Sequence, residues 1–212
     1  MRPDGPLSQT SLPRVEGGWA TLVADPPWSY SDRLPGPGRG AAKHYETMGV
    51  PEIEALGEQV ASVMAPDAHL YLWCTNSFVE EAHRIVRAWG FRTDNKQIVT
   101  WVKMTKDGGR VRIGMGRRFR NSTEQCIFAV RGNLPVLRRN TPNVFFAPRS
   151  THSSKPQEFY DIVTSMSPGP RLELFSRVAR EGFVGWGYEY PEEEDDWLVR
   201  GVAELDRVLP QI

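Results

Sequence analysis

Runs of consecutive apolar residues alternate along this chain with segments whose apolar residues recur every three or four positions. The first pattern is typical of strands buried on both faces of a sheet, and the second of amphipathic helices. The apolar runs predict strands at 19–24, 68–74, 96–103, 124–132, 143–147, 171–175 and 183–189. The periodic segments predict helices at 51–64, 77–89, 155–166 and 192–209.

This alternation favours an α/β fold with one mostly parallel sheet and helices on both of its faces. Crossovers between parallel strands are then right-handed, and ligands bind at the carboxyl ends of the strands. Residues 1–18, rich in Pro, Ser and Gly, are expected to form a flexible arm, and residues 19–212 a single domain. A Gly/Pro-rich stretch at 32–48 is expected to form a mobile loop beside the end of the first strand.

The 212 residues suffice for one sizeable domain with its own core. Cys74 and Cys126 lie in apolar runs, away from any Cys or His at ligand spacing, so we expect buried, reduced thiols and no metal site. No apolar run approaches the roughly 20 residues that span a bilayer, and the first residues lack the apolar core of a secretion signal. We therefore expect a cytoplasmic protein that does not enter a membrane.

Charge is balanced overall but unevenly distributed. Seven basic residues and one acid lie between Lys103 and Arg120, together with four glycines, whereas residues 189–196 hold six acids and no base. The acidic run is typical of a solvated face. The basic run, which includes Arg117 and Arg118, indicates a cationic loop suited to a polyanion, so that their replacement by alanine should weaken nucleic-acid binding. The zero net charge argues against a protein that coats nucleic acid non-specifically.

The first strand ends in LVADPPWSY, residues 22–30. Each proline lacks an amide hydrogen and fixes φ, so the motif predicts a rigid turn whose carbonyls face outward without a competing amide. The Asp25 carboxylate adds an acceptor, and Trp28 offers a flat face for a base. Such a group of acceptors suits a planar amino group, whose lone pair would be localised when both hydrogens are accepted. A simple strand stop, with Trp28 as core filler, is the structural alternative.

At these residues the chain resembles the N6-adenine methyltransferases with a DPPW motif, which are related to the catalytic subunit that makes N6-methyladenosine in messenger RNA and have bacterial and phage members. The resemblance covers residues 19–190. It is carried by ADPPW (24–28), HYETM (44–48), LYLWCTN (70–76), WGF (89–91), WVK (101–103), EQC (124–126), RSTHSSKPQEFYDIV (149–163), SPGPRLELFSR (167–177) and GFVGWGYE (182–189). It implies a Rossmann-like, S-adenosylmethionine-dependent methyltransferase fold with a permuted motif order.

The resemblance also implies roles for individual residues. Asp25, Pro26, Pro27 and Trp28 would hold the target amine as the catalytic motif. The residues that would bind S-adenosyl-L-methionine are Asp25, Lys155, Glu173, Phe175, Arg177 and Glu189, with Lys155 facing the methionyl carboxylate and Glu189 the ribose. On the substrate side the resemblance implies Tyr45, Asn121 and Glu124, to which the basic run adds Lys103, Arg117 and Arg118.

Two of these residues have structural alternatives. Lys155 precedes Pro156, so it could simply begin a helix. Glu173 lies inside an apolar strand, where an acid is costly unless paired, and a structural ion pair with Arg171 or Arg177 would also explain it. The histidines His44 and His152 are not assigned as bases, because methylation of a neutral amine needs little base beforehand.

The function that the resemblance implies is methyl transfer to the N6 amine of adenine in nucleic acid, with DNA the first choice of substrate and RNA the second. The base would have to be single-stranded or flipped out of the duplex. The choice of sequence would depend on the two loops or on a partner subunit, in a homodimer or a heterodimer. A catalytically silent nucleic-acid-binding partner is one alternative, although such members typically lose DPPW. A nucleotide-binding module is another, weakened because no GxxxxGK[ST] loop occurs.

Overall fold

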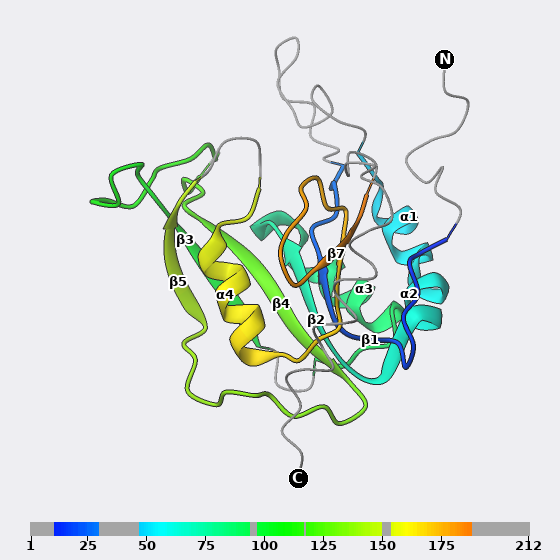
Figure 1. Ribbon diagram of the computed structural model, residues 1–212. Coiled ribbons are helices and arrows are strands. Elements are labelled where there is room, and N and C mark those ends of the chain that lie inside the picture. The colour runs from blue at the N-terminus through cyan, green and yellow to red at the C-terminus, as the bar shows by residue number, and fades with distance from the viewer. Residues whose placement is uncertain (1–10, 30–46, 94–96, 117, 150–153, 188–212) are drawn as a thin grey trace.

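The computed structural model describes residues 11–29, 47–93, 97–116, 118–149 and 154–187 (Figure 1). Within them, seven strands form one sheet in the order β5-β3-β4-β2-β1-β6-β7. The strands are β1 (Trp19–Ala24), β2 (Met64–Cys74), β3 (Ile98–Met104), β4 (Thr123–Arg131), β5 (Val144–Pro148), β6 (Arg171–Leu174) and β7 (Val184–Trp186). The helices are α1 (Val50–Ala55), α2 (Gly57–Val63), α3 (Val79–Ala88) and α4 (Gln157–Met166), with a 3-10 turn η2 at Asn76–Phe78.

The sheet is mostly parallel, as the apolar strands predict. β1 pairs in parallel with β2 and β6, β6 with β7, and β3 with β5. β4 runs antiparallel to both of its neighbours, β2 and β3. The sequence pattern did not indicate this reversal, because an apolar run does not encode a strand's direction. As a result, the first residues of β4 lie at the same edge of the sheet as the last residues of β1 and β2.

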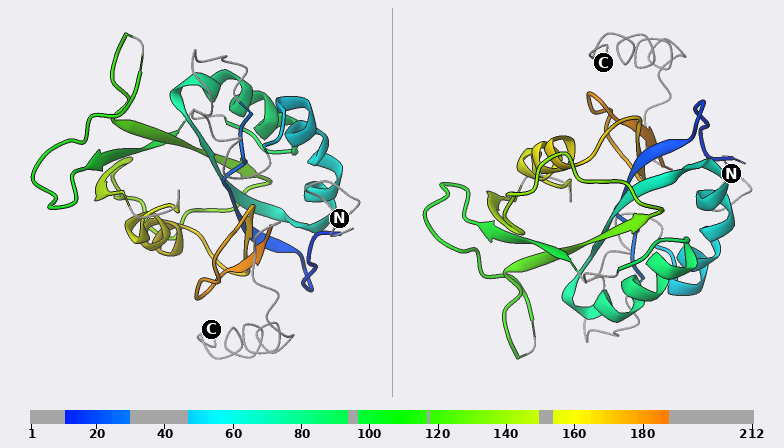
Figure 2. Two further views of the ribbon diagram at one scale, coloured as in Figure 1. Left: turned by 90° about the horizontal axis from the view of Figure 1, so that it is seen from above. Right: turned by 90° about the horizontal axis from the view of Figure 1, so that it is seen from below.

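Helices cover both faces of the sheet (Figure 2). α1, α2 and α3 pack on one face through buried residues that include Ile53, Val60 and Ile85. On the other face, α4 packs through Phe159 and Val163 against aromatic side chains of the central strands. The expected two-sided α/β architecture is therefore confirmed. Among the described residues, no helix has the length and apolar character needed to cross a membrane.

Two boundaries differ from the sequence-based expectation. The single helix expected at 51–64 is broken at Leu56, because the Ile53 carbonyl accepts a hydrogen bond from Trp89 Nε1 at 3.0 Å and Gly57 packs closely against the Ala88 carbonyl. Residues 11–18, assigned from composition to a flexible arm, instead lie against the domain. Leu12 is buried in the core, and this apolar contact accounts for the difference. The helix expected at 192–209 lies outside the described residues.

A buried polar cluster fixes the segment that follows α4 to the sheet. His69 Nδ1 lies 2.8 Å from Ser167 Oγ, and Tyr71 Oη lies 2.7 Å from the same oxygen. The other His69 nitrogen, Nε2, lies 3.0 Å from the Leu134 carbonyl oxygen. All three polar side chains of this cluster are shielded from water. The cluster ties the end of α4 to β2, and so helps to hold the beginning of α4 at the opposite, carboxyl edge.

Candidate active site

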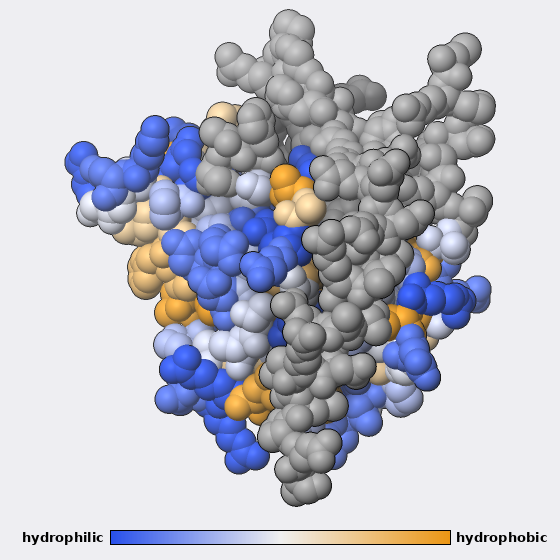
Figure 3. All heavy atoms as spheres, viewed as in Figure 1, coloured by the Kyte–Doolittle hydropathy of each residue, from blue (hydrophilic) through white to orange (hydrophobic). Residues whose placement is uncertain are grey.

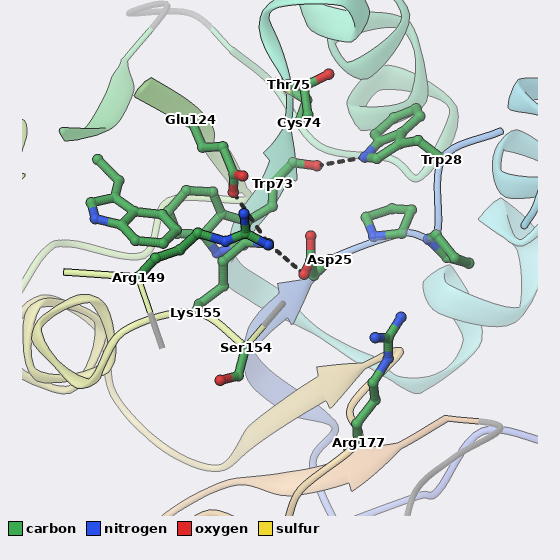
Figure 4. A pocket seen from close by; sticks show the side chains of 13 residues that line it. Asp25, Trp28, Trp73, Cys74, Thr75, Glu124, Arg149, Ser154, Lys155 and Arg177 are labelled. Atoms are coloured by element: carbon green, nitrogen blue, oxygen red, sulfur yellow. Dashed lines mark hydrogen bonds and ion pairs between the residues drawn. The ribbon is translucent and has the colours of Figure 1, made fainter. Parts of the chain in front are cut away.

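A pocket of about 230 Å³ lies at the edge of the sheet where β1, β2 and β6 end and β4 begins (Figure 4). One water occupies roughly 30 Å³ in the liquid, so the pocket is large enough for an organic group. Its lining residues are Asp25, Pro26, Pro27, Trp28, Trp73, Cys74, Thr75, Trp101, Glu124, Arg149, Ser154, Lys155 and Arg177. This is the crevice in which ligands bind in open α/β sheets, and the whole DPPW motif lies in it.

The two proline carbonyls are not bare, which corrects the expectation drawn from the missing proline amides. The Pro26 carbonyl accepts a hydrogen bond from the Trp28 amide at 2.9 Å, forming a tight turn centred on Pro27. The Pro27 carbonyl accepts one from the Met48 amide at 2.8 Å. The competing donors thus come from Trp28 and Met48 rather than from the prolines. Each carbonyl oxygen retains a second lone pair for a ligand.

Trp28 is held in place on two sides. Its indole Nε1 donates to the Trp73 carbonyl at 3.1 Å, and its ring stacks on Phe78 with the ring centroids 4.8 Å apart (Figure 4). The side chain lines the pocket yet is only 5% exposed. Trp28 therefore both fills the core, as the structural alternative supposed, and forms part of the pocket wall.

Lys155 lies between two carboxylates. Its Nζ is 2.5 Å from Asp25 Oδ2 and 3.4 Å from Glu124 Oε2, and it also lies 5.0 Å above the Trp73 ring (Figure 4). Lys155 precedes α4, Asp25 follows β1 and Glu124 begins β4, so three separate elements supply this cluster. Lys155 thus both precedes α4 and lies beside the DPPW turn, while the role in cofactor binding that the resemblance implies stays a prediction.

The charges in this cluster stabilise one another. Burial raises the pKa of Asp25, against the opposing effect of Lys155. Burial alone would lower the pKa of Lys155, but Asp25 and Glu124 together raise it above its usual value. Burial likewise works against ionisation of Glu124, yet Lys155 and Lys103 bring its pKa below the usual value. Lys155 is consequently a firmly charged ammonium at neutral pH.

Lys103 extends the cluster toward the loop between β3 and β4. Its Nζ donates to Glu124 Oε1 at 2.6 Å and lies 5.4 Å from the centre of the Trp101 ring. Lys103, Glu124, Lys155 and Asp25 therefore form a row of alternating charges, of which all but Lys103 line the pocket. The row brings together two residues expected on the substrate side with two expected to bind the cofactor.

Arg177 reaches the pocket through an unusual turn. Phe175, directly after β6, has a φ of 63°, a left-handed backbone conformation that residues other than glycine rarely adopt. The following Ser176 amide donates to the Trp186 carbonyl at 3.1 Å. Gly187 lies against this turn so closely that a Cβ would come within 2.9 Å of the Ser176 nitrogen. Packing against the end of β7 thus holds the turn that directs Arg177 toward the pocket.

Glu173 lies outside the charge cluster around Lys155 and has polar partners of its own. Its carboxylate accepts hydrogen bonds from Tyr160 and, at 3.3 Å, from Ser176, and it lies 3.8 Å from Arg180 Nε. The expectation from sequence named Arg171 or Arg177 as the structural ion-pair partner, and the structure gives Arg180 instead, because the chain turns back after β6. Neither Glu173 nor Phe175 is among the described residues that line the pocket.

The other expected site residues are more widely distributed. Arg118 and Asn121 are exposed on the loop between β3 and β4, outside the pocket lining. Tyr45, Arg117 and Glu189 lie outside the described residues. Their assigned roles stay predictions.

The sequence analysis did not single out several residues that line the pocket. They are Trp73, Cys74, Thr75, Arg149 and Ser154. Trp101 of the WVK motif is only 2% exposed, and it also lines the pocket. All of the missed residues lie inside the motifs LYLWCTN and RSTHSSKP, so position within those motifs was the available signal. Cys74 and Cys126 are buried free thiols, as expected, and burial raises the pKa of Cys74 to about 12.

The sheet order and the crevice at the carboxyl strand ends define a Rossmann-like α/β protein. Residues 19–189 match the MT-A70 family, and the chain belongs to that family. Membership confirms both the resemblance seen in the sequence motifs and the methyltransferase fold class.

The chain matches a relative of similar length and others that are much longer. It is 32% identical over 166 residues to the N(6)-adenosine-methyltransferase MT-A70-like protein of Drosophila melanogaster, covering 77% of this chain and 25% of that protein. It is 29% identical over 166 residues to the human N(6)-adenosine-methyltransferase catalytic subunit METTL3, covering 77% and 26%. It is 28% identical over 214 residues to the type II methyltransferase M.MunI of Mycoplasma sp, covering 92% and 86%. The chain thus spans about a quarter of the adenosine-methyltransferase relatives and most of M.MunI.

Proposed function

We propose that this chain is a methyltransferase that uses S-adenosyl-L-methionine to methylate the N6 amine of adenine in nucleic acid. The observation that carries the proposal is the placement of the Asp25 carboxylate in the crevice, 2.5 Å from the Lys155 ammonium. A carboxylate and a carbonyl at one turn suit an amino group with two hydrogens. The names of the adenosine-methyltransferase relatives support the same reaction.

The charges around the pocket fit the proposed methyl donor. S-adenosyl-L-methionine supplies an electrophilic methyl group on a positively charged sulfur. Lys155 uses two of its three N–H directions on Asp25 and Glu124, which leaves one for the methionyl carboxylate. The lining holds two further cations, Arg149 and Arg177, of which Arg177 would also face that carboxylate. Asp25 and Glu124 in turn favour positive charge at the sulfur and at the amino group of the methionyl end.

The DPPW turn would prepare the amine for attack. Asp25 accepts one of its hydrogens, and the second lone pair of the Pro26 carbonyl accepts the other. The nitrogen lone pair is thereby withdrawn from the ring and becomes available along the direction of the methyl group. S-adenosyl-L-methionine would supply the methyl group to this lone pair, its thioether would leave with the electron pair of the broken S–C bond, and the methylated nitrogen would release one proton to solvent. The attacking nitrogen needs no prior deprotonation.

We place DNA before RNA as the substrate, because the chain matches the type II methyltransferase M.MunI over most of its length and the adenosine methyltransferases over a quarter of theirs. The target adenine has to leave a base stack to reach Asp25 inside the crevice.

The test is methyl transfer from radiolabelled S-adenosyl-L-methionine to adenine-containing DNA and RNA, with N6-methyladenine identified by mass spectrometry. Asp25→Ala and Asp25→Asn should each lower the rate at least 100-fold, because both remove the charged acceptor. Asp161→Asn, on the exposed side of α4, is the matched control and should leave the rate unchanged. Survival of activity in Asp25→Ala would contradict the mechanism. Cofactor binding by a wild-type chain that methylates neither polymer would favour the silent-partner alternative.

A further inference from the structure

The loop at residues 105–122, which we call the basic arm, projects beyond the sheet from the ends of β3 and β4 (Figure 1). Three of its large apolar side chains are largely exposed: Ile113 is 73% exposed, Met115 67% and Phe119 89%. Single exposed apolar residues are ordinary on protein surfaces. Three of them within seven positions, on a segment otherwise dominated by cations, require a partner that has both apolar surface and negative charge.

Backbone hydrogen bonds join the described residues on the two sides of the basic arm. The Gly114 amide donates to the Asn121 carbonyl at 3.1 Å, and the Asn121 amide donates to the Met115 carbonyl at 3.3 Å. A Cβ at Gly114 would collide with the Asn121 carbonyl, and one at Gly116 with the Phe119 carbonyl. The two glycines therefore permit a tight reversal of the chain, and Phe119 lies on that reversal with its ring in solvent.

The basic arm is joined directly to the pocket wall. At its base the Lys103 amide donates to the Ser122 carbonyl at 2.8 Å, and two residues later Glu124 lines the pocket. Hydrophilic side chains gather over the region where the basic arm projects in Figure 3. Its described cations are Lys106, Arg110, Arg112, Arg118 and Arg120. A polyanion that binds these cations would pass beside the mouth of the pocket.

We propose that the basic arm binds nucleic acid and that Phe119, assisted by Met115, inserts into the base stack as the wedge that replaces the extracted adenine. The inference rests on the proposed function for the reason why a base must leave the stack, and it assigns the extraction to particular residues. Apolar side chains beside cations are what proteins use to separate base steps, because the cations hold the phosphates while the apolar group takes the place of a stacking partner. A protein partner would match the apolar residues, but it would not account for five cations around them.

The experiment uses duplex DNA of random sequence that carries 2-aminopurine in place of adenine, because the fluorescence of this base rises when it unstacks. The full chain should raise the fluorescence on binding. Phe119→Ala should reduce that rise at least threefold at saturation, with affinity within about twofold of wild type because the cations remain. Phe119→Trp should restore the rise. Leu137→Ala, which removes another exposed apolar side chain (62% exposed), is the matched control and should match the wild type.

A methylation assay adds a second measurement. Phe119→Ala should lose at least tenfold of the methylation rate on duplex DNA and less than twofold on single-stranded DNA, where extraction from a duplex is not needed. A wild type that fails to methylate refutes the proposed function, while the fluorescence still decides the role of the wedge. An unchanged fluorescence rise in Phe119→Ala, or none in the wild type, overturns the wedge. A lower molar mass of Phe119→Ala by light scattering, with the fluorescence rise intact, would assign the basic arm to subunit contact instead.

Discussion

Lys155 Nζ lies 2.5 Å from Asp25 Oδ2 although 130 positions separate the two residues in the chain. Asp25 stands at the end of the first strand, and Lys155 stands just before the helix that leads into the sixth. Their meeting depends on the parallel pairing of β1 with β6, which brings both to the carboxyl edge of the sheet. The proposed acceptor of the target amine, Asp25, and the cation expected to bind the cofactor, Lys155, are therefore parts of one charge cluster.

Removal of the Lys155 charge should destabilise the fold at neutral pH. Lys155→Met leaves Asp25 and Glu124 without their shared cation. Breaking a fully buried pair costs about 3–5 kcal/mol, but the Asp25 side chain is 34% exposed and water screens part of the effect. We expect the free energy of unfolding to fall by roughly 2–3 kcal/mol at pH 7, measured by chemical denaturation.

A second substitution in the same charge cluster serves as the control for Lys155→Met. Adding Asp25→Asn to Lys155→Met removes one of the two uncompensated carboxylates, so the double variant should be more stable than Lys155→Met alone. A double variant that is less stable by the sum of the two single effects would show that the ion pair contributes no coupling.

Protonation of His69 should weaken the fold in mild acid. Burial lowers the pKa of His69 from its ordinary value of 6.5, against the Leu134 carbonyl, which favours the charged ring. Below pH 6.5 the unfolded chain therefore binds more protons than the folded chain, and stability decreases as the pH falls toward the folded-state pKa. The slope from one proton is at most about 1.4 kcal/mol per pH unit.

The measurement is the free energy of unfolding from pH 8 to pH 5. His69→Gln should flatten the slope below pH 6.5, whatever its effect on stability at pH 8. His83→Gln, on α3 and outside the buried cluster, should keep it. Parallel curves for the wild type and His69→Gln would contradict the assignment.

Replacing Gly187 by alanine should weaken cofactor binding, although it adds only one methyl group. Its Cβ in Gly187→Ala would come within 3.0 Å of the Phe175 carbonyl carbon and displace the turn that directs Arg177. We expect at least a tenfold loss of affinity for S-adenosyl-L-methionine, measured by calorimetry. Gly109→Ala meets only the Asp107 side chain at 3.6 Å or more and should bind as the wild type does. Equal affinities of the two variants for S-adenosyl-L-methionine would contradict a role of Arg177 in binding it.

The cations of the basic arm should determine how nucleic-acid binding responds to salt. For duplex DNA, the slope of log K against log salt changes by about 0.9 for each phosphate contact. Arg112→Ala and Arg118→Ala together should reduce its magnitude by about 1 to 2, measured by fluorescence anisotropy at several salt concentrations. Arg84→Ala, which breaks an ion pair with Glu54 on the helical face, is the control and should preserve the slope.

The sequence predicted the fold class because apolar runs and helical periodicity report burial directly. Each expected strand within the described residues is present, with ends shifted by at most four positions. The pattern could not give the direction of a strand, nor the contacts with other elements that interrupt a helix. The reversal of β4 leaves no trace in its composition, and the break at Leu56 comes from Trp89, a residue 33 positions away on another element.

Site residues could be predicted where a sequence motif specified them. Their contacts could not be predicted where tertiary packing determined them. DPPW was singled out by its position at a strand end and by the family motif, and Lys155 by the family motif alone; both line the pocket. The occupied proline carbonyls were missed because the competing amides belong to Trp28 and Met48, whose approach depends on tertiary structure. Likewise, Glu173 pairs with Arg180 only because the chain folds back after β6.

At the base of the basic arm, the Lys103 amide donates to the Ser122 carbonyl, and the Lys103 carbonyl accepts a hydrogen bond from the Arg112 amide at 2.7 Å. These two bonds hold the described base of the basic arm on Lys103, close to the start of β4 and to Glu124. If the basic arm binds nucleic acid as proposed, substitutions at its exposed tip should alter that binding while Glu124 keeps its place in the pocket wall. The exposed tip is therefore where an engineer would first try to change the choice of nucleic acid.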